Sequence, residues 1–311
     1  MPEFDRRRFL GTAAGIGAGS IALGKSGAST SEAPSSPASE ATDAPPAPPM
    51  VTLGHTGIRT SRLAQGTGVR GWDRQSDQTR MGFEQFVSLF HHAYARGVRF
   101  FDMADLYGTH VYFREALRTL PREQLTLLTK MWWRFDGPEA STSAAHREQV
   151  AKSTLERFRH ELTTDCVDIV LLHCLMDAAW PEQMKPYLAA LNAAKEAKQV
   201  HAVGVSCHDF GALKTAVNTP WVEVILARTN PEGVKMDAAP AEVEAVLADA
   251  KAAGKTIIGM KIFGEGKLVD DRERCIEYAQ SHDWLDAMTI GFHKPEQIDD
   301  VLRLMAKHPA T

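Results

Sequence analysis

The chain has 311 residues, of which 44% are hydrophobic and 24% are charged, and its formal net charge is −4. This near balance of acidic and basic residues offers no basic surface for nucleic acid or for an anionic membrane, so we expect neither as a partner. Four cysteines (Cys166, Cys174, Cys207 and Cys275) show no C-x-x-C pair and no zinc spacing, so no metal site is expected.

The N-terminal 28 residues have the pattern of an export signal. An arginine cluster, DRRRFL at residues 5–10, precedes a weakly apolar, Gly/Ala-rich stretch over residues 11–24. That stretch is too short for a stable membrane-spanning helix, which favours a removable signal over an anchor. The pattern resembles a twin-arginine signal, with Asp5 where Ser or Thr is usual. We expect residues 1–28 to engage the twin-arginine export machinery and the mature protein to be periplasmic or extracytoplasmic; a disordered basic start is the alternative.

Residues 29–50 differ in composition from the rest of the chain. They are rich in Pro, Ala and Ser, and residues 29–49 contain no aromatic or large aliphatic side chain. Such a segment cannot bury enough apolar surface to order itself, so we predict a semi-extended linker. The remaining residues, 51–311, suit a single α/β barrel in length.

From residue 62 onward, strand and helix patterns alternate eight times. Short runs of β-branched and aliphatic residues, typical of buried parallel strands, cover residues 62–65, 98–102, 124–129, 167–173, 200–206, 222–227, 256–260 and 287–291. Helical patterns cover residues 83–96, 111–120, 147–162, 184–198, 210–217, 241–253, 271–280 and 295–307. This order predicts an α/β fold, a single-domain (β/α)8 TIM barrel.

An open doubly wound sheet is the alternative for this order of elements. It would place a glycine-rich dinucleotide loop after its first strand, and residues 66–71 do spell G-x-G-x-x-G. A lone match is weak, and no clear helix begins straight after it. We therefore do not interpret this segment as a dinucleotide fingerprint.

Four polar residues follow three successive predicted strands. Asp102 and Tyr107 come after the second strand, Lys130 after the third, and His173 ends the fourth. In a parallel barrel the C-terminal ends of the strands meet at one mouth, where barrel enzymes carry out their chemistry. Each residue alone has a structural explanation, such as a turn cap or a core histidine. Together they predict a proton-transfer site.

Several motifs resemble the aldo-keto reductase family. Residues 53–63 (LGHTGIRTSRL) are similar to its first hairpin and strand, and residues 101–108 (FDMADLYG) are similar to its D-x-A-x-x-Y-G signature. Residues 129–130 (TK), 171–173 (LLH) and 204–206 (GVS) are similar to the ends of its third, fourth and fifth strands. The resemblance covers residues 52–307 in the family's order, and it implies a barrel oxidoreductase.

Carbonyl reduction gives each of the four residues a role. Tyr107 would donate a proton to the carbonyl oxygen, but a phenol titrates at about pH 10 and is a poor acid at neutrality. Lys130 would lower the pKa of this phenol by stabilising its anion, and Asp102 would keep Lys130 charged. His173 would hydrogen-bond the carbonyl oxygen and orient the substrate. The family resemblance implies these same catalytic roles.

The resemblance also implies a nicotinamide dinucleotide, NADP or NAD, extended across the mouth. Residues 259–268 resemble the loop that wraps its pyrophosphate, and residues 291–300 resemble the turn that binds its adenosine. Cys207 stands where the family usually has Asn, and Val301 stands where it has an adenine-contacting Asn. The cofactor-binding residues that we expect are Gly66, Thr67, Ser206, Cys207, Lys261, Gly264, Gly266, Lys294 and Gln297. The few basic residues in the adenosine turn leave the choice between NADP, NAD and no cofactor open.

The sequence ends soon after the last predicted helix, which predicts an open mouth lined by Trp72, Trp132 and Trp133. Such an aromatic wall suits a sugar ring or an aryl carbonyl. Cys174 and Cys207 follow neighbouring strands, so a disulfide or two separate thiols would both fit.

We therefore expect an exported oxidoreductase that transfers a hydride between a nicotinamide and an aldehyde or ketone, or the corresponding alcohol, including a sugar. A non-catalytic binding protein on the same barrel is the first alternative. A barrel isomerase or lyase that uses Lys130 without a dinucleotide is the second.

Overall fold

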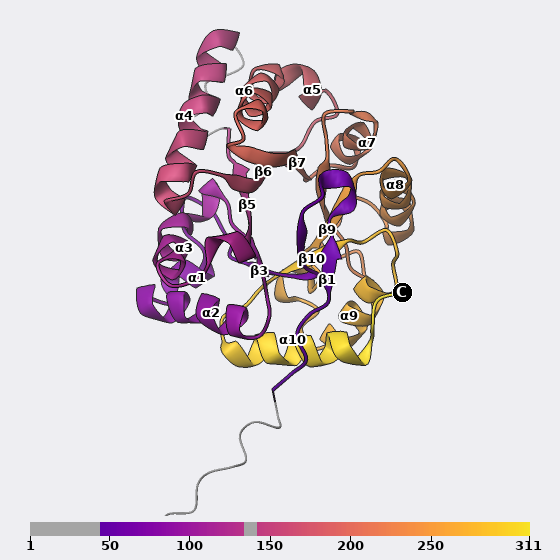
Figure 1. Ribbon diagram of the computed structural model, residues 1–311. Helices are drawn as coiled ribbons and strands as arrows, with labels where there is room; N and C mark the ends of the chain where they lie inside the picture. Colours follow the sequence, from indigo (N-terminus) through magenta and orange to yellow (C-terminus); the bar gives the residue numbers. More distant parts are fainter. Residues whose placement is uncertain (1–43, 134–141) are drawn as a thin grey trace, which may run out of the picture. The chain divides into compact units, whose positions relative to one another are not determined.

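The computed structural model describes residues 44–133 and 142–311. The predicted signal (1–28) and the linker as far as residue 43 lie outside the described residues. The unit from Ala44 to Thr311 is a closed barrel of parallel strands in the order β10-β3-β4-β5-β6-β7-β8-β9, with helices around the outside (Figure 1). The predicted (β/α)8 TIM barrel is confirmed.

The barrel strands are β3 (Leu63–Gly66), β4 (Phe100–Asp102), β5 (Thr126–Met131), β6 (Val167–Leu175), β7 (Val200–Cys207), β8 (Val224–Arg228), β9 (Thr256–Met260) and β10 (Ala287–Gly291). The helices are α1 (Asp77–Arg80), α2 (Phe83–Ala95), α3 (His110–Leu117), α4 (Ala144–Leu162), α5 (Trp180–Gln183), α6 (Lys185–Glu196), α7 (Phe210–Asn218), α8 (Pro240–Ala252), α9 (Arg272–Gln280) and α10 (Pro295–Lys307). Short 3-10 turns are η1 (Gly54–Thr56), η2 (Asp105–Tyr107), η3 (Arg122–Gln124) and η4 (Gly264–Gly266).

Alternation along the strands divides the buried side chains between two cores. Phe100 and Leu128 belong to the core inside the barrel, whereas their neighbours Phe101 and Leu127 pack in the core under the helices. Successive side chains on a strand point to opposite faces, so the inward positions recur every second residue. This alternation decides which polar residues at the strand ends face the mouth.

A two-stranded hairpin lies across the N-terminal end of the barrel. β1 (Met50–Thr52) pairs antiparallel with β2 (Arg59–Ser61), and the Arg62 amide donates to the Pro49 carbonyl at 2.8 Å. Leu53 is fully buried and packs in the interior core. The hairpin therefore closes the end of the barrel opposite the mouth.

Some predicted boundaries differ from the observed ones. The strand predicted over residues 124–129 is observed at Thr126–Met131, because Lys130 continues the strand rather than ending it. The helix predicted over residues 184–198 is observed as α6, Lys185–Glu196, and the short helix α5, Trp180–Gln183, precedes it. Phe83 begins α2 but is 48% exposed, and its ring lies against Tyr112 instead of entering the core.

The four cysteines all lie in the described part of the chain and none of them forms a disulfide, so the bond considered between Cys174 and Cys207 is absent. Within the described ranges, no helix has the length and apolar character needed to cross a membrane. The same part of the chain contains no group of three or more His, Cys, Asp or Glu side chains arranged to hold a metal ion.

Candidate active site

The four polar residues predicted from the strand ends do meet at the barrel mouth. Asp102 ends β4, Lys130 and His173 lie near the ends of β5 and β6, and Tyr107 ends η2, which directly follows β4. The three strand residues each stand two positions after an inward-facing apolar residue: Phe100, Leu128 and Leu171. The polar groups therefore form the layer above the apolar interior of the barrel.

Lys130 is fully buried and its charge is paired. Its ammonium group forms an ion pair with Asp102 and donates to the Met103 carbonyl at 3.0 Å. Thr289 on β10 donates to the second carboxylate oxygen of Asp102 at 2.9 Å. A buried charge is tolerated only when it is paired and hydrogen-bonded, and this arrangement satisfies both partners.

Tyr107 contacts both Lys130 and His173. Its hydroxyl lies 3.4 Å from Nε2 of His173, and the Lys130 ammonium lies 4.9 Å from the centre of the phenol ring. The rings of Tyr107 and His173 meet edge to face with their centroids 5.5 Å apart. A carbonyl oxygen placed between the hydroxyl and the imidazole would accept hydrogen bonds from both.

The environment keeps both groups neutral at physiological pH. Burial raises the pKa of Tyr107 well above its usual value, and the Asp102 carboxylate adds to this rise. Burial also lowers the pKa of His173 far below its usual value, and the charge of Lys130 adds to this fall. We expected Lys130 to lower the pKa of the phenol, but the net shift is upward, with burial as its largest cause and the Asp102 carboxylate as the second.

Two glycines of the G-x-G-x-x-G segment pack against the Tyr107 ring. A Cβ atom added at Gly68 or at Gly71 would lie 2.3 Å from ring carbons of Tyr107, far inside van der Waals contact. The third glycine, Gly66, lies beside Thr289, whose hydroxyl would be 2.9 Å from an added Cβ. Gly68 and Gly71 of this segment are thus explained by close packing around the tyrosine.

Of the three tryptophans predicted at the mouth, Trp132 and Trp72 lie beside the imidazole, whereas Trp133 packs against the core under the helices. The Trp132 ring meets the His173 ring edge to face at 5.8 Å and the Trp72 ring at 5.7 Å. Trp72 is 59% exposed. Trp133 lies next to Trp132, with ring centroids 6.2 Å apart. An aromatic wall therefore stands beside the imidazole at the mouth.

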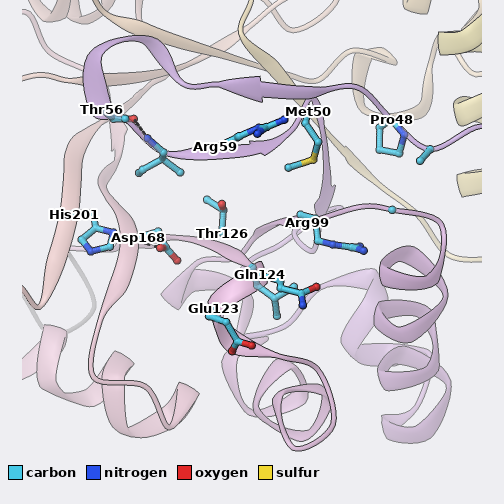
Figure 2. A pocket seen from close by; sticks show the side chains of 15 residues that line it. Pro48, Met50, Thr56, Arg59, Arg99, Glu123, Gln124, Thr126, Asp168 and His201 are labelled. Carbon is cyan, nitrogen blue, oxygen red and sulfur yellow. Dashed lines mark hydrogen bonds and ion pairs between the residues drawn. The ribbon is translucent and has the colours of Figure 1, made fainter.

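A separate cavity of about 930 Å³ lies at the opposite end of the barrel (Figure 2). Met50 and Arg59 of the hairpin face it from one side, and Thr126, Asp168 and His201 contribute from the N-terminal ends of β5, β6 and β7. The cavity contains none of the predicted site residues. Asp102, Tyr107, Lys130 and His173, hereafter the tetrad, therefore lie at the mouth and have no part in this cavity.

The sequence from Leu63 to His282 matches the family model described as the aldo/keto reductase family, which spans well over half of the chain. The chain belongs to this family. The resemblance to the aldo-keto reductases that we inferred from the strand-end motifs is confirmed.

Three individual proteins are similar to this chain over a short stretch or at low identity. A stretch of 84 residues is 34% identical to "Probable aldo-keto reductase 1" of Glycine max, and it covers 26% of this chain and 23% of that protein. A solved structure from Pseudomonas aeruginosa, assigned to the aldo-keto reductases, has a TM-score of 0.66 at 20% identity and covers 83% of this chain and 94% of its own. A holo-form aldo-keto reductase from Bacillus halodurans has a TM-score of 0.65 at 16% identity, with coverage of 84% and 92%. These structures share the fold.

Three of the residues expected to border the nicotinamide in an aldo-keto reductase lie close to the tetrad. The Thr67 hydroxyl donates to the Asp102 carbonyl at 2.9 Å, and Gly66 pairs with Asp102 across β3 and β4. Ser206 is buried and accepts a hydrogen bond from the Cys174 amide at 3.3 Å. The Cys207 side chain lies elsewhere, in the outer core, because it is on the opposite face of β7 from Ser206.

The loop after β9, which is expected to hold the pyrophosphate, contains two glycines in the left-handed region. Gly264 and Gly266 have φ angles of +57° and +90°, and the space where a Cβ of Gly266 would lie is open within 4 Å. Lys261 supplies charge, but its ammonium group forms an ion pair with Glu265. The amides of Gly264 and Gly266 donate to the Lys261 and Phe263 carbonyls, at 2.8 and 2.9 Å, so the loop as it stands does not present these two N–H groups to a phosphate.

The turn that is expected to bind the adenosine has two of its amide donors already occupied. Gln297 accepts hydrogen bonds from the amides of His293 and Lys294, at 2.7 and 3.2 Å, and so occupies donors at the start of α10. Lys294 is exposed at the helix N-cap. The residues present therefore fit the nicotinamide part of a dinucleotide better than its phosphates.

Proposed function

We propose that this aldo-keto reductase family member is an oxidoreductase that reduces aldehydes or ketones, including sugars, or oxidises the corresponding alcohols. The observation that supports this most directly is the contact of the Tyr107 hydroxyl with His173, above the buried Lys130–Asp102 pair. Proton donation, orientation and charge stabilisation are thereby gathered around one carbonyl position. A nicotinamide dinucleotide, when bound, supplies the hydride.

In this proposal Tyr107 donates the proton that the reduced carbonyl oxygen needs. Its raised pKa keeps it protonated before reaction. Lys130, held by Asp102 and the Met103 carbonyl, offsets the negative charge that develops on the phenol as the proton leaves. Neutral His173 donates a hydrogen bond to the same oxygen and fixes its position. Thr67 and Ser206 would hold the nicotinamide end of the dinucleotide.

Replacing Tyr107 by Phe tests this mechanism. We expect Tyr107→Phe to lower kcat for carbonyl reduction by about 10²–10⁴-fold, since general acid catalysis contributes that much. Nucleotide binding, measured by fluorescence titration, should change little. Tyr112→Phe removes a hydroxyl that donates a long hydrogen bond of 3.4 Å to the Thr79 carbonyl, and it should retain activity. Equal turnover in the two variants would disprove the role of Tyr107.

The alternative is a binding protein that keeps the barrel without the reaction. The Lys261–Glu265 pair and the Gln297 contacts at α10 favour it, because both occupy groups expected to hold a dinucleotide. Titration of the protein with NADPH and then NADH separates the two functions. Saturable binding at micromolar levels supports the oxidoreductase and identifies its cofactor. Absence of binding up to millimolar levels favours the binding protein.

We also propose that the chain is exported by the twin-arginine pathway, with residues 1–28 as its signal. This rests on the arginine cluster and the short apolar stretch of the sequence. Replacing Arg6 and Arg7 by Lys should leave the protein in the cytoplasmic fraction, whereas the unchanged chain should be found outside it. Equal distribution of both proteins after fractionation would contradict the proposal.

A further inference from the structure

A β-bulge beside His173 turns the next side chain toward the mouth. The register of β6 and β7 shifts between Leu172 and Leu175, and Cys174 has a left-handed φ of +57°. Simple alternation would send its side chain to the face opposite that of His173. Instead, the Cys174 thiol lies 3.5 Å from Nε2 of His208. Bulges commonly re-aim a side chain next to an active site.

His208 brings this thiol into the neighbourhood of the tetrad. It stands two residues after the inward-facing Ser206, and its ring centroid is 6.4 Å from that of His173. Ser206 pairs with Leu226, so His208 is level with Arg228, two residues further along β8. Both Cys174 and His208 are partly exposed. The thiol and imidazole are thus accessible from the mouth.

The imidazole of this pair is neutral. Burial lowers the pKa of His208 to about 3, and the nearby cations Arg228, Lys261 and Lys130 contribute to the shift. His208 is therefore neutral and able to accept the thiol proton in a hydrogen bond. Each of these three cations is paired with a carboxylate, Asp237, Glu265 and Asp102 respectively, so the feature that distinguishes this thiol is its hydrogen bond to a neutral imidazole.

Cys166 provides a contrast within the same chain. It is also partly exposed, but it precedes β6 at the other end of the barrel. Burial and the charge of Asp168 raise the pKa of its thiol. We therefore expect Cys166 to be the less nucleophilic of the two partly exposed cysteines.

We propose that Cys174 and His208 form a nucleophilic pair that bonds reversibly to an aldehyde held at the tetrad. The sulfur forms a bond to the carbonyl carbon as the C=O π bond breaks. The carbonyl oxygen takes a proton from the Tyr107 hydroxyl, and the proton that leaves the thiol returns to Tyr107, while His208 orients the thiol through its hydrogen bond. The product is a neutral thiohemiacetal, and Tyr107 and His208 end in their starting protonation states. No oxidant or reductant is consumed. The placement of the aldehyde rests on the proposed function, whereas the reactivity of the thiol does not.

This pair makes aldehydes the preferred substrate class over ketones. An aldehyde carbon is less hindered and more electrophilic, so a thiol adds to it far more readily. The site would consequently hold an aldehyde by a covalent bond as well as by the hydrogen bonds of Tyr107 and His173.

Alkylation of the intact protein by iodoacetamide, read peptide by peptide in a mass spectrometer, tests the proposal. We expect Cys174 to be labelled about tenfold faster than Cys166 in the same sample. Propionaldehyde should slow labelling of Cys174 and leave Cys166 unchanged, and propanol, which lacks the carbonyl, should protect neither. His208→Asn should reduce the difference between the two cysteines, with circular dichroism confirming its fold.

Two results would overturn the inference: equal labelling of Cys174 and Cys166 in the unchanged protein, or equal labelling of Cys174 with and without propionaldehyde. Both measurements use the unchanged chain, so neither depends on how the variant folds. Fast, aldehyde-protected labelling in a protein that reduces no carbonyl would support the pair while contradicting the proposed function. Carbonyl reduction by a protein whose Cys174 is unreactive would support the proposed function while contradicting the pair.

Discussion

Tyr107 is positioned by neighbours that have no side chain. Gly68 and Gly71 bring the backbone of the loop after β3 directly against its ring, and Lys130 lies near the centre of that ring. A larger residue at either glycine would move the ring or the loop. Because the hydroxyl must stay near His173, these glycines control the geometry of the proton donor.

We predict that Gly68→Ala destabilises the fold by about 1–3 kcal/mol, as expected for overpacking, and also lowers carbonyl reduction. Urea unfolding measures the first effect and kcat the second. Gly211→Ala is a matched control at the start of α7, where an added Cβ would meet its nearest neighbour, a side-chain oxygen of Asp209, at 3.0 Å. Similar losses in both variants would argue against a specific contact with Tyr107.

At this scale the sequence predicts the tetrad but not its surroundings. Asp102, Lys130 and His173 are predictable because each follows or ends a recognisable apolar run, and Tyr107 comes at a short spacing after the first of them. The Cys174 side chain lies near His208 because of a bulge in the pairing of β6 and β7, and no local sequence pattern indicates that bulge. Cys207 is expected at the cofactor from the sequence, but the alternation of β7 buries it in the outer core.

The turn that carries Tyr107 is anchored by a helix distant in sequence. Arg157 on α4 makes two hydrogen bonds to the buried carboxylate of Asp105 in η2, at 3.0 and 2.9 Å. The same guanidinium contacts Glu161, which in turn accepts from His110 at 2.7 Å. His110 contacts Thr129, the residue before Lys130, at 2.7 Å. The network thus links α4 to η2, which carries Tyr107, and to β5, which carries Lys130.

We predict that Arg157→Met lowers the free energy of unfolding by about 3 kcal/mol, because the buried carboxylate of Asp105 would lose its two hydrogen bonds from Arg157. Adding Asp105→Asn should recover part of this loss. Arg118→Met is the control, since the Arg118–Glu115 pair is exposed and is expected to contribute less than about 1 kcal/mol. Chemical unfolding of these variants and the unchanged protein measures this, and an equal cost for Arg157 and Arg118 would contradict it.

Among the elements, the sequence predicts the strands at residues 256–260 and 287–291 and the helix at 295–307 to the residue. Glycines, a proline and clear apolar runs mark their limits. It places the strand of Lys130 two residues early because a lysine normally ends a buried run, and here an inward-facing ion pair lets the strand continue. The Arg157 network joins residues far apart in the chain, so no sequence pattern reveals it.

For the whole molecule, acid stability depends on Glu161. Burial opposes its ionisation, but the hydrogen bonds and charges of His110 and Arg157 outweigh burial and lower the pKa of Glu161 from 4.5 to about 2. A carboxyl group with a lower pKa in the folded state stabilises the protein above its unfolded pKa. This contribution is lost as the pH falls from 4.5 toward 2.

We predict that the unfolding free energy of the unchanged protein falls by up to about 3 kcal/mol over this interval through Glu161 alone. Glu161→Gln should be less stable at neutral pH and should lose less on acidification. Glu84→Gln, at an exposed position of α2, should follow the unchanged protein. Urea unfolding at a series of pH values measures the slopes, and parallel curves for all three proteins would refute the assignment.

The hydrogen bond from Thr289 to Asp102 has a consequence for how the molecule is made. It joins residues 187 apart in sequence, and it forms only when β10, the last strand, docks against β3. Contacts of such separation are formed late, because the chain between them must first be ordered. A growing chain can therefore pair Lys130 with Asp102 early, but it completes the environment of that carboxylate only after β10 has been synthesised. Complete assembly of this polar layer therefore requires that the barrel has closed.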